Sequence, residues 1–105
     1  MTLQEEQAPI DRRIASALIE ATPENWDTAE LNVRRAESDG TEKMEIEITN
    51  PKGLREIVGP TEEIYTALYA LSDCFRAHGV VWREAQYSVN MNGSGEWAFK
   101  ASFAY

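Results

Sequence analysis

The chain closes on an alternating stretch, Trp97-Ala98-Phe99-Lys100-Ala101-Ser102-Phe103-Ala104-Tyr105. Successive side chains of a strand point to opposite faces of a sheet, so its aromatic residues share one face. Residues 84–91 alternate in the same way, with Ala85, Tyr87, Val89 and Met91 on one face. Between the two segments lies Asn92-Gly93-Ser94-Gly95, where glycine and asparagine tolerate positive φ. The pattern predicts a β-hairpin.

A well-marked helix precedes this hairpin. Thr61 is suited to the N-cap, and Gly79 to the left-handed position that ends a helix. The predicted core stripe consists of Ile64, Leu68, Leu71 and Phe75, widened by Ala67 and Cys74. Beside or opposite this stripe fall Tyr65, Tyr69, Ser72 and Asp73. These four predict a mixed aromatic and acidic surface that either faces a partner or covers the sheet edge.

The first half of the chain supplies one more helix and at least two more strands. The helix is expected from residue 4 or 9 to residue 21, where Thr22-Pro23 ends it. Period-two alternation predicts strands at 28–36 and 42–49, and a weaker strand at 54–58. We therefore expect one α+β domain over residues 1–105. Its antiparallel sheet of four to five strands carries two helices on one face, in the order α-β-β-(β)-α-β-β.

This arrangement of motifs resembles the bacterial YezG-like antitoxin and immunity-protein family. The matching residues are Pro60-Thr61-Glu62-Glu63-Ile64-Tyr65, Leu68, Leu71, Phe75, Trp82, Gly93, Gly95, Phe99, Phe103 and Tyr105, with Pro23 and Trp26 upstream. They are packing and turn positions. The resemblance implies an α+β fold and the binding and silencing of a toxin, which is made by the same cell or delivered by a neighbour. Residues 38–58 depart from the family pattern.

Composition narrows the partner class. The chain has 105 residues and a net charge of −8, from 18 acidic against 10 basic residues. Such a charge repels nucleic-acid phosphates and anionic lipid and attracts basic proteins. No apolar run reaches the roughly 18 residues of a membrane span, and no secretory leader pattern is present. With one cysteine, we expect a cytoplasmic protein, monomer or homodimer, that binds neither nucleic acid nor membrane.

An acidic surface is the predicted partner-binding site. Glu30, Glu45 and Glu47 are expected on the sheet face opposite the helices, with Glu37, Asp39 and Glu42 clustered at the adjoining turn. Tyr69 and Asp73 on the second helix complete the candidate set. Carboxylates can occupy the basic cleft of a toxin that cuts nucleic acid, although the same charges also suit simple solubility. Trp82 and Trp97 are further candidates, either as interface anchors or as core residues.

Catalytic constellations are sparse. His78 is the only histidine, and beside Gly79 it suits the end of a helix, where cations complement the helix dipole. Cys74 and His78 stand four residues apart on one helix, yet nothing in the sequence orients them for nucleophilic catalysis. No zinc, nucleotide or serine-hydrolase motif is present. We therefore predict a non-enzymatic protein without cofactor or metal.

The sequence supports three functions in descending order. The first is an immunity protein that inhibits a cognate toxin, such as a nuclease, by occluding its active cleft with an acidic surface. The second is a small adaptor or chaperone that binds a secretion component or a client protein through its helical face. The third is an enzyme or ligand binder using Cys74 and His78. The interface is left open among the acidic sheet face, the second helix and the strand edge at 54–58.

Overall fold

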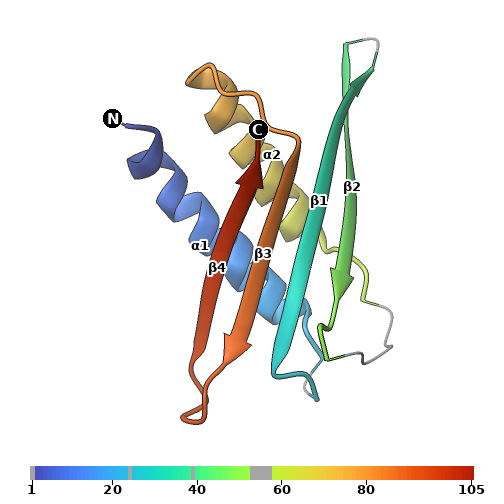
Figure 1. Cartoon of the computed structure of the whole chain (residues 1–105), viewed down its shortest axis with the longest axis vertical. Coiled ribbons are helices and arrows are strands. Elements are labelled where there is room, and N and C mark those ends of the chain that lie inside the picture. The colour runs from blue at the N-terminus through green and yellow to red at the C-terminus, as the bar shows by residue number, and fades with distance from the viewer. Residues whose placement is uncertain (1, 24, 39, 53–57) are drawn as a thin grey trace.

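Two helices lie on one side of a four-stranded antiparallel sheet (Figure 1). The computed structural model describes residues 2–23, 25–38, 40–52 and 58–105. Its elements are α1 (Leu3–Ala21), β1 (Thr28–Ser38), β2 (Thr41–Thr49), α2 (Glu62–Ala77), β3 (Glu84–Met91) and β4 (Trp97–Ala104). The predicted α+β class and element order are confirmed. Most of the weaker predicted strand, 54–57, lies outside the described residues, and Val58 makes one antiparallel bridge to Ile48.

The sheet has the order β2-β1-β3-β4, so β1 lies between β2 and β3. The β1–β2 and β3–β4 pairs are hairpins of consecutive strands. The β1–β3 pair joins the two halves of the chain, with Leu31 opposite Tyr87. Both of these residues point toward the helices and are fully buried. The helix side of β1 and β3 therefore forms the floor of the core.

Helix α1 begins before Pro9 rather than at it. The Thr2 hydroxyl accepts a hydrogen bond from the Glu5 backbone N–H at 3.2 Å and so caps the helix. Proline lacks the N–H that would bond one turn back, but Pro9 lies inside α1 and the helix continues through it. The first turn places Glu6 alongside the end of α2, which is important for the side-chain cluster described below.

Helix α2 has the predicted boundaries. The Thr61 side chain accepts from the Ile64 N–H at 3.3 Å, and Gly79 has a φ of +69°, the left-handed conformation that follows the last turn. The predicted stripe from Ile64 to Phe75 is buried. Ser72, which we expected on the surface, is instead 3 % exposed. Among the described residues, no helix combines the length and apolar character that a membrane crossing needs.

One core joins the two layers, and its largest members are aromatic. Trp82, which the sequence left open, is 1 % exposed and packs against Phe75 at a ring-centroid distance of 6.1 Å. Phe75 also meets Phe103 of β4 edge-to-face at 5.5 Å. Trp97 is partly buried at the margin of this core. The core covers the part of β4 around Phe99 less completely, and the Phe99 side chain is 39 % exposed.

Candidate partner-binding surface

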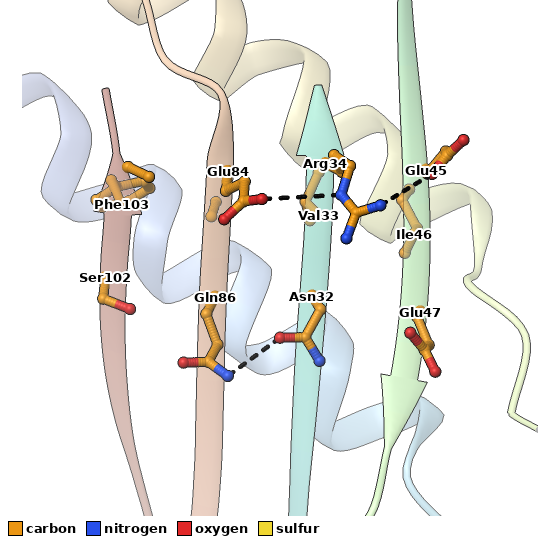
Figure 2. Close-up of a pocket in the computed structure, with 12 residues that line it drawn as sticks. Asn32, Val33, Arg34, Glu45, Ile46, Glu47, Glu84, Gln86, Ser102 and Phe103 are labelled. Atoms are coloured by element: carbon orange, nitrogen blue, oxygen red, sulfur yellow. Dashed lines mark hydrogen bonds and ion pairs between the residues drawn. The ribbon is translucent and has the colours of Figure 1, made fainter. Parts of the chain in front are cut away.

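The face of the sheet opposite the helices carries polar and charged side chains (Figure 2). Cross-strand pairing arranges them in rows that run from β2 through β1 and β3 to β4. Three central rows are Glu45-Arg34-Glu84-Ala104, Glu47-Asn32-Gln86-Ser102 and Thr49-Glu30-Ser88-Lys100. We call these rows the outer face. In these rows β2 contributes Glu45 and Glu47, and β4 contributes Lys100. Lys43, one row further along β2, is exposed on the same side of the sheet.

An open hollow of about 650 Å³ lies across these strands. Arg34 lies within it between two carboxylates, with Nη1 at 3.9 Å from Glu45 and Nε at 3.8 Å from Glu84. The Arg34 and Glu45 side chains are 73 % and 81 % exposed. Ion pairs this exposed contribute about 0–1 kcal/mol. The charges of the outer face therefore do little for folding and are accessible to a partner.

The predicted acidic surface is divided by the sheet rather than continuous. Glu30, Glu45 and Glu47 lie on the outer face, as expected. Glu37 and Glu42 lie on the helix side, opposite each other at the end of the β1–β2 hairpin. Their positions follow the alternation of the buried residues of the same strands, so they point the other way. Asp39 lies outside the described residues.

Glu42 is neutralised within the fold. Its side chain is 13 % exposed and accepts hydrogen bonds from Arg76 at 2.9 Å and from Ser72 at 2.8 Å. Arg35, 10 % exposed, lies 3.5 Å away and also contacts Glu37. Arg35 further donates to the Trp82 carbonyl at 3.3 Å. The expectation that Glu42 forms part of an exposed acidic patch is therefore wrong, because this carboxylate ties β2 to α2.

The helix candidates form a separate surface on α2. Tyr65 and Tyr69 are 39 % and 48 % exposed, one turn apart. Asp73 continues the same ridge and pairs with Arg76 at 2.9 Å. Since both helices lie on one side of the sheet, this ridge and the outer face belong to different layers of the molecule. A partner confined to the outer face therefore leaves the tyrosines uncovered.

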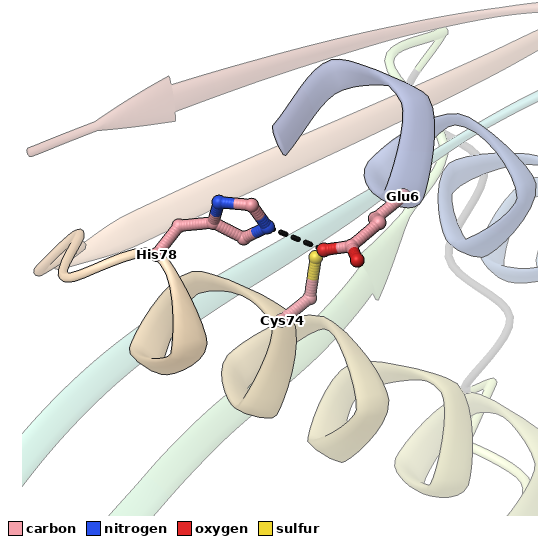
Figure 3. Close-up of side chains that lie close together, drawn as sticks. All are labelled: Glu6, Cys74 and His78. Atoms are coloured by element: carbon pink, nitrogen blue, oxygen red, sulfur yellow. Dashed lines mark hydrogen bonds and ion pairs between the residues drawn. The ribbon is translucent and has the colours of Figure 1, made fainter. Parts of the chain in front are cut away.

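Cys74 and His78 are joined by a carboxylate that the sequence did not indicate (Figure 3). Glu6 of α1 contacts His78 Nε2 directly, and the candidate ligand atoms of the three residues lie within 4.8 Å of one another. Burial, followed by the charges of Glu6 and Asp11, raises the pKa of the Cys74 thiol. A protonated thiol is a poor nucleophile. The surroundings therefore disfavour catalysis by Cys74 and His78.

A partly buried polar contact links α1 to β3. The Tyr87 hydroxyl donates to Asp11 Oδ1 at 2.6 Å, and Gln7 donates to Asp11 Oδ2 at 3.1 Å. Burial raises the pKa of Asp11, against the lowering effect of these two hydrogen bonds. Burial and the Asp11 carboxylate raise the pKa of Tyr87, so the hydroxyl keeps its proton and acts as donor. This contact fixes the helix layer on the sheet.

Sequence alternation contained signals for the residues that were missed. Arg35 and Glu42 fall on the same alternation as the buried residues of β1 and β2, which marks them as inward-facing charges. Glu84 falls on the outward alternation of β3. Its position beside Arg34, however, depends on the pairing of β1 with β3. Local patterns do not specify that pairing.

We compared the sequence with known protein families and with curated proteins. No model of a known protein family matches the sequence, and a search among curated proteins finds no significant match.

Proposed function

We propose that this chain is a cytoplasmic immunity protein, or antitoxin, that binds a cognate bacterial toxin and inhibits it without catalysis. The proposal joins the resemblance to the YezG-like family with the net charge of −8 and the geometry of the outer face. The observation that carries it is that Glu45 and Glu47 lie on the sheet face opposite the one that α1 and α2 cover (Figure 1). Such a face can be occupied whole by a partner.

Charge complementarity supplies the mechanism. A toxin that cleaves nucleic acid needs a basic cleft for phosphate, and exposed carboxylates fit such a cleft. On the outer face, the carboxylates Glu30, Glu45, Glu47 and Glu84 outnumber the cations Arg34 and Lys100, even when Lys43 at its margin is added. Arg34 already lies between two glutamates, so a partner's arginine or lysine would compete with it or bind along the β2 side. Long-range attraction would also accelerate association at low salt.

In this proposal Glu42, Asp73 and Tyr69, which the sequence placed among the partner-binding candidates, are not part of the toxin-binding surface. Glu42 is engaged by Arg76 and Ser72 and contributes to stability rather than to binding. Asp73 and Tyr69 lie in the helix layer and would contact the toxin only if it reached around the molecule. The proposed contact set is therefore the β1–β2 part of the outer face, with Glu84 added.

The test compares two matched pairs of neutralised glutamates. Glu45→Gln with Glu47→Gln removes two charges from the outer face, and Glu62→Gln with Glu63→Gln removes two exposed charges from the start of α2. Each bait is used for capture from the native cell lysate with a salt titration, and the captured protein is then co-expressed with each variant in a growth assay. The proposal expects a basic, growth-inhibiting partner that the outer-face pair fails to neutralise and the helix pair neutralises. Capture of a harmless protein, or equal loss with both pairs, would contradict it.

An adaptor or chaperone function is the second candidate, favoured by the exposed Tyr65 and Tyr69 on α2. Exposed tyrosines on one ridge are typical interface anchors. If this function is the correct one, Tyr65→Ser with Tyr69→Ser abolishes capture of a secretion or client protein, while Glu45→Gln with Glu47→Gln leaves capture unchanged.

A further inference from the structure

Three side chains with metal-binding atoms converge between the two helices, away from the outer face. Cys74 and His78 are four residues apart on α2, and residues at this spacing lie on the same side of a helix. Glu6 comes from the first turn of α1, which passes the end of α2. Their sulfur, nitrogen and oxygen ligand atoms lie within 4.8 Å of one another. The chain thus brings a thiol, an imidazole and a carboxylate together across about 70 residues.

The geometry differs from that of a catalytic triad. In a triad the histidine uses one ring nitrogen for the nucleophile and the other for the orienting carboxylate. Figure 3 shows instead that the Glu6 carboxylate and the Cys74 sulfur lie at the same end of the imidazole ring, at Nε2, while Nδ1 points away from both. Three donors that converge on one point are typical of a shared cation rather than of a proton relay.

We propose that Glu6, Cys74 and His78 bind a thiophilic divalent cation, with Zn²⁺ as the best fit. Zinc accepts sulfur, imidazole nitrogen and carboxylate oxygen in tetrahedral geometry, with bonds of about 2.0–2.3 Å. Tetrahedral bonds of these lengths place the sulfur, nitrogen and oxygen ligand atoms about 3.3–3.6 Å apart. The separations in the structure require only side-chain adjustments to reach this range, in which the Glu6–His78 contact opens to admit the ion.

The local charge favours a cation. Glu6 and Asp11 both act on the Cys74 thiol electrostatically. A divalent ion experiences these carboxylates as attraction, and on binding it displaces the thiol proton into solvent. With three protein ligands, one tetrahedral position is open to water. The ion would fasten the first two turns of α1 to the end of α2, on the opposite side of the molecule from the outer face, so this inference does not rest on the proposed function.

Cobalt titration of the full chain tests the site directly, because Co²⁺ occupies zinc sites and a cobalt–thiolate bond gives a charge-transfer absorption. The expected result is one Co²⁺ per chain with that absorption, lost on addition of Zn²⁺, together with a higher Tm in Zn²⁺ than in chelator. Cys74→Ser should abolish the absorption. Glu6→Gln and His78→Gln should each weaken Co²⁺ binding at least tenfold.

Glu20→Gln is the matched control, because Glu20 is an exposed carboxylate on the same helix and lies outside the cluster. It should bind Co²⁺ as tightly as the wild type. Circular dichroism in chelator checks that each variant folds. If Cys74→Ser does not fold, Glu6→Gln provides the test instead, because Glu6 is only partly buried. Absence of the thiolate absorption in the wild type would overturn the proposal. Equal affinities of Glu6→Gln, His78→Gln and the wild type would overturn it as well.

Discussion

The hydroxyl of Tyr87 provides a sharp test of how the helices are fixed to the sheet. Tyr87→Phe removes one oxygen atom from a fully buried side chain and keeps the ring, which packs edge-to-face on Phe103 at 6.0 Å. The lost hydrogen bond is short, 2.6 Å, and its acceptor is the carboxylate of Asp11. Hydrogen bonds to charged groups contribute about 1.5–3 kcal/mol. Since Asp11 is only partly buried and Gln7 still donates to it, we expect a loss of about 2 kcal/mol.

Urea unfolding followed by tryptophan fluorescence measures this loss, and thermal unfolding provides a second measurement. For 105 residues the unfolding entropy near Tm is about 0.22 kcal/mol per K, so 2 kcal/mol corresponds to a drop of about 9 °C. Tyr69→Phe is the matched control, because Tyr69 is 48 % exposed on α2. Its change should stay within about 0.5 kcal/mol. If Tyr87→Phe costs no more than this control, the Asp11 contact does not stabilise the fold.

Three further substitutions probe other parts of the structure by the same unfolding assay. The raised pKa of Asp11 means that the folded state holds this proton to higher pH than the unfolded state, so wild-type stability falls as pH rises through the folded pKa. The stability of Asp11→Asn relative to the wild type should therefore increase as pH rises from below 3.8, and a pH-independent difference would contradict the assignment. Phe75→Ala removes a fully buried ring and should cost about 3–5 kcal/mol, whereas a loss below about 1 kcal/mol would show that the core repacks. Gly79→Ala forces alanine into a φ of +69°, although its Cβ would meet open space, and should cost about 1 kcal/mol; an unchanged stability would mean that this turn relaxes.

Local structure could be predicted from the sequence because each element carries its own physical signals. Thr61 and Gly79 bound α2 through capping and positive φ, and both act as expected. Strand alternation placed Leu31 and Tyr87 inward and Glu45 outward, as observed. These signals depend on residues two to four positions apart, so they survive without knowledge of the tertiary structure. The start of α1 was ambiguous because Pro9 lies inside a helix that Thr2 caps.

Long-range geometry could not be predicted in this way. Alternation says which face a strand buries, but not which strand lies beside it, so the neighbourhood of Arg34 and Glu84 required the structure. The meeting of Glu6 with Cys74 and His78 depends on how two helices cross, which no local pattern encodes. Glu42 is a different case. Its alternation marked it as inward, and the acidic composition of its neighbourhood obscured that signal.

The central position of β1 has a consequence during synthesis. Its two neighbours are made at very different times, since β2 ends at Thr49 and β3 is complete only at Met91. At roughly 5–20 residues per second, the ribosome takes on the order of 2–8 s to pass from the end of β2 to the end of β3. For that interval the nascent β1–β2 hairpin exposes the backbone edge with which β3 later pairs and the apolar face that α2 later covers. An exposed edge and apolar face of this kind can bind chaperones or aggregate. The growing chain therefore passes through a vulnerable half-sheet, and translation speed between residues 50 and 91 should influence how much of it reaches the native state.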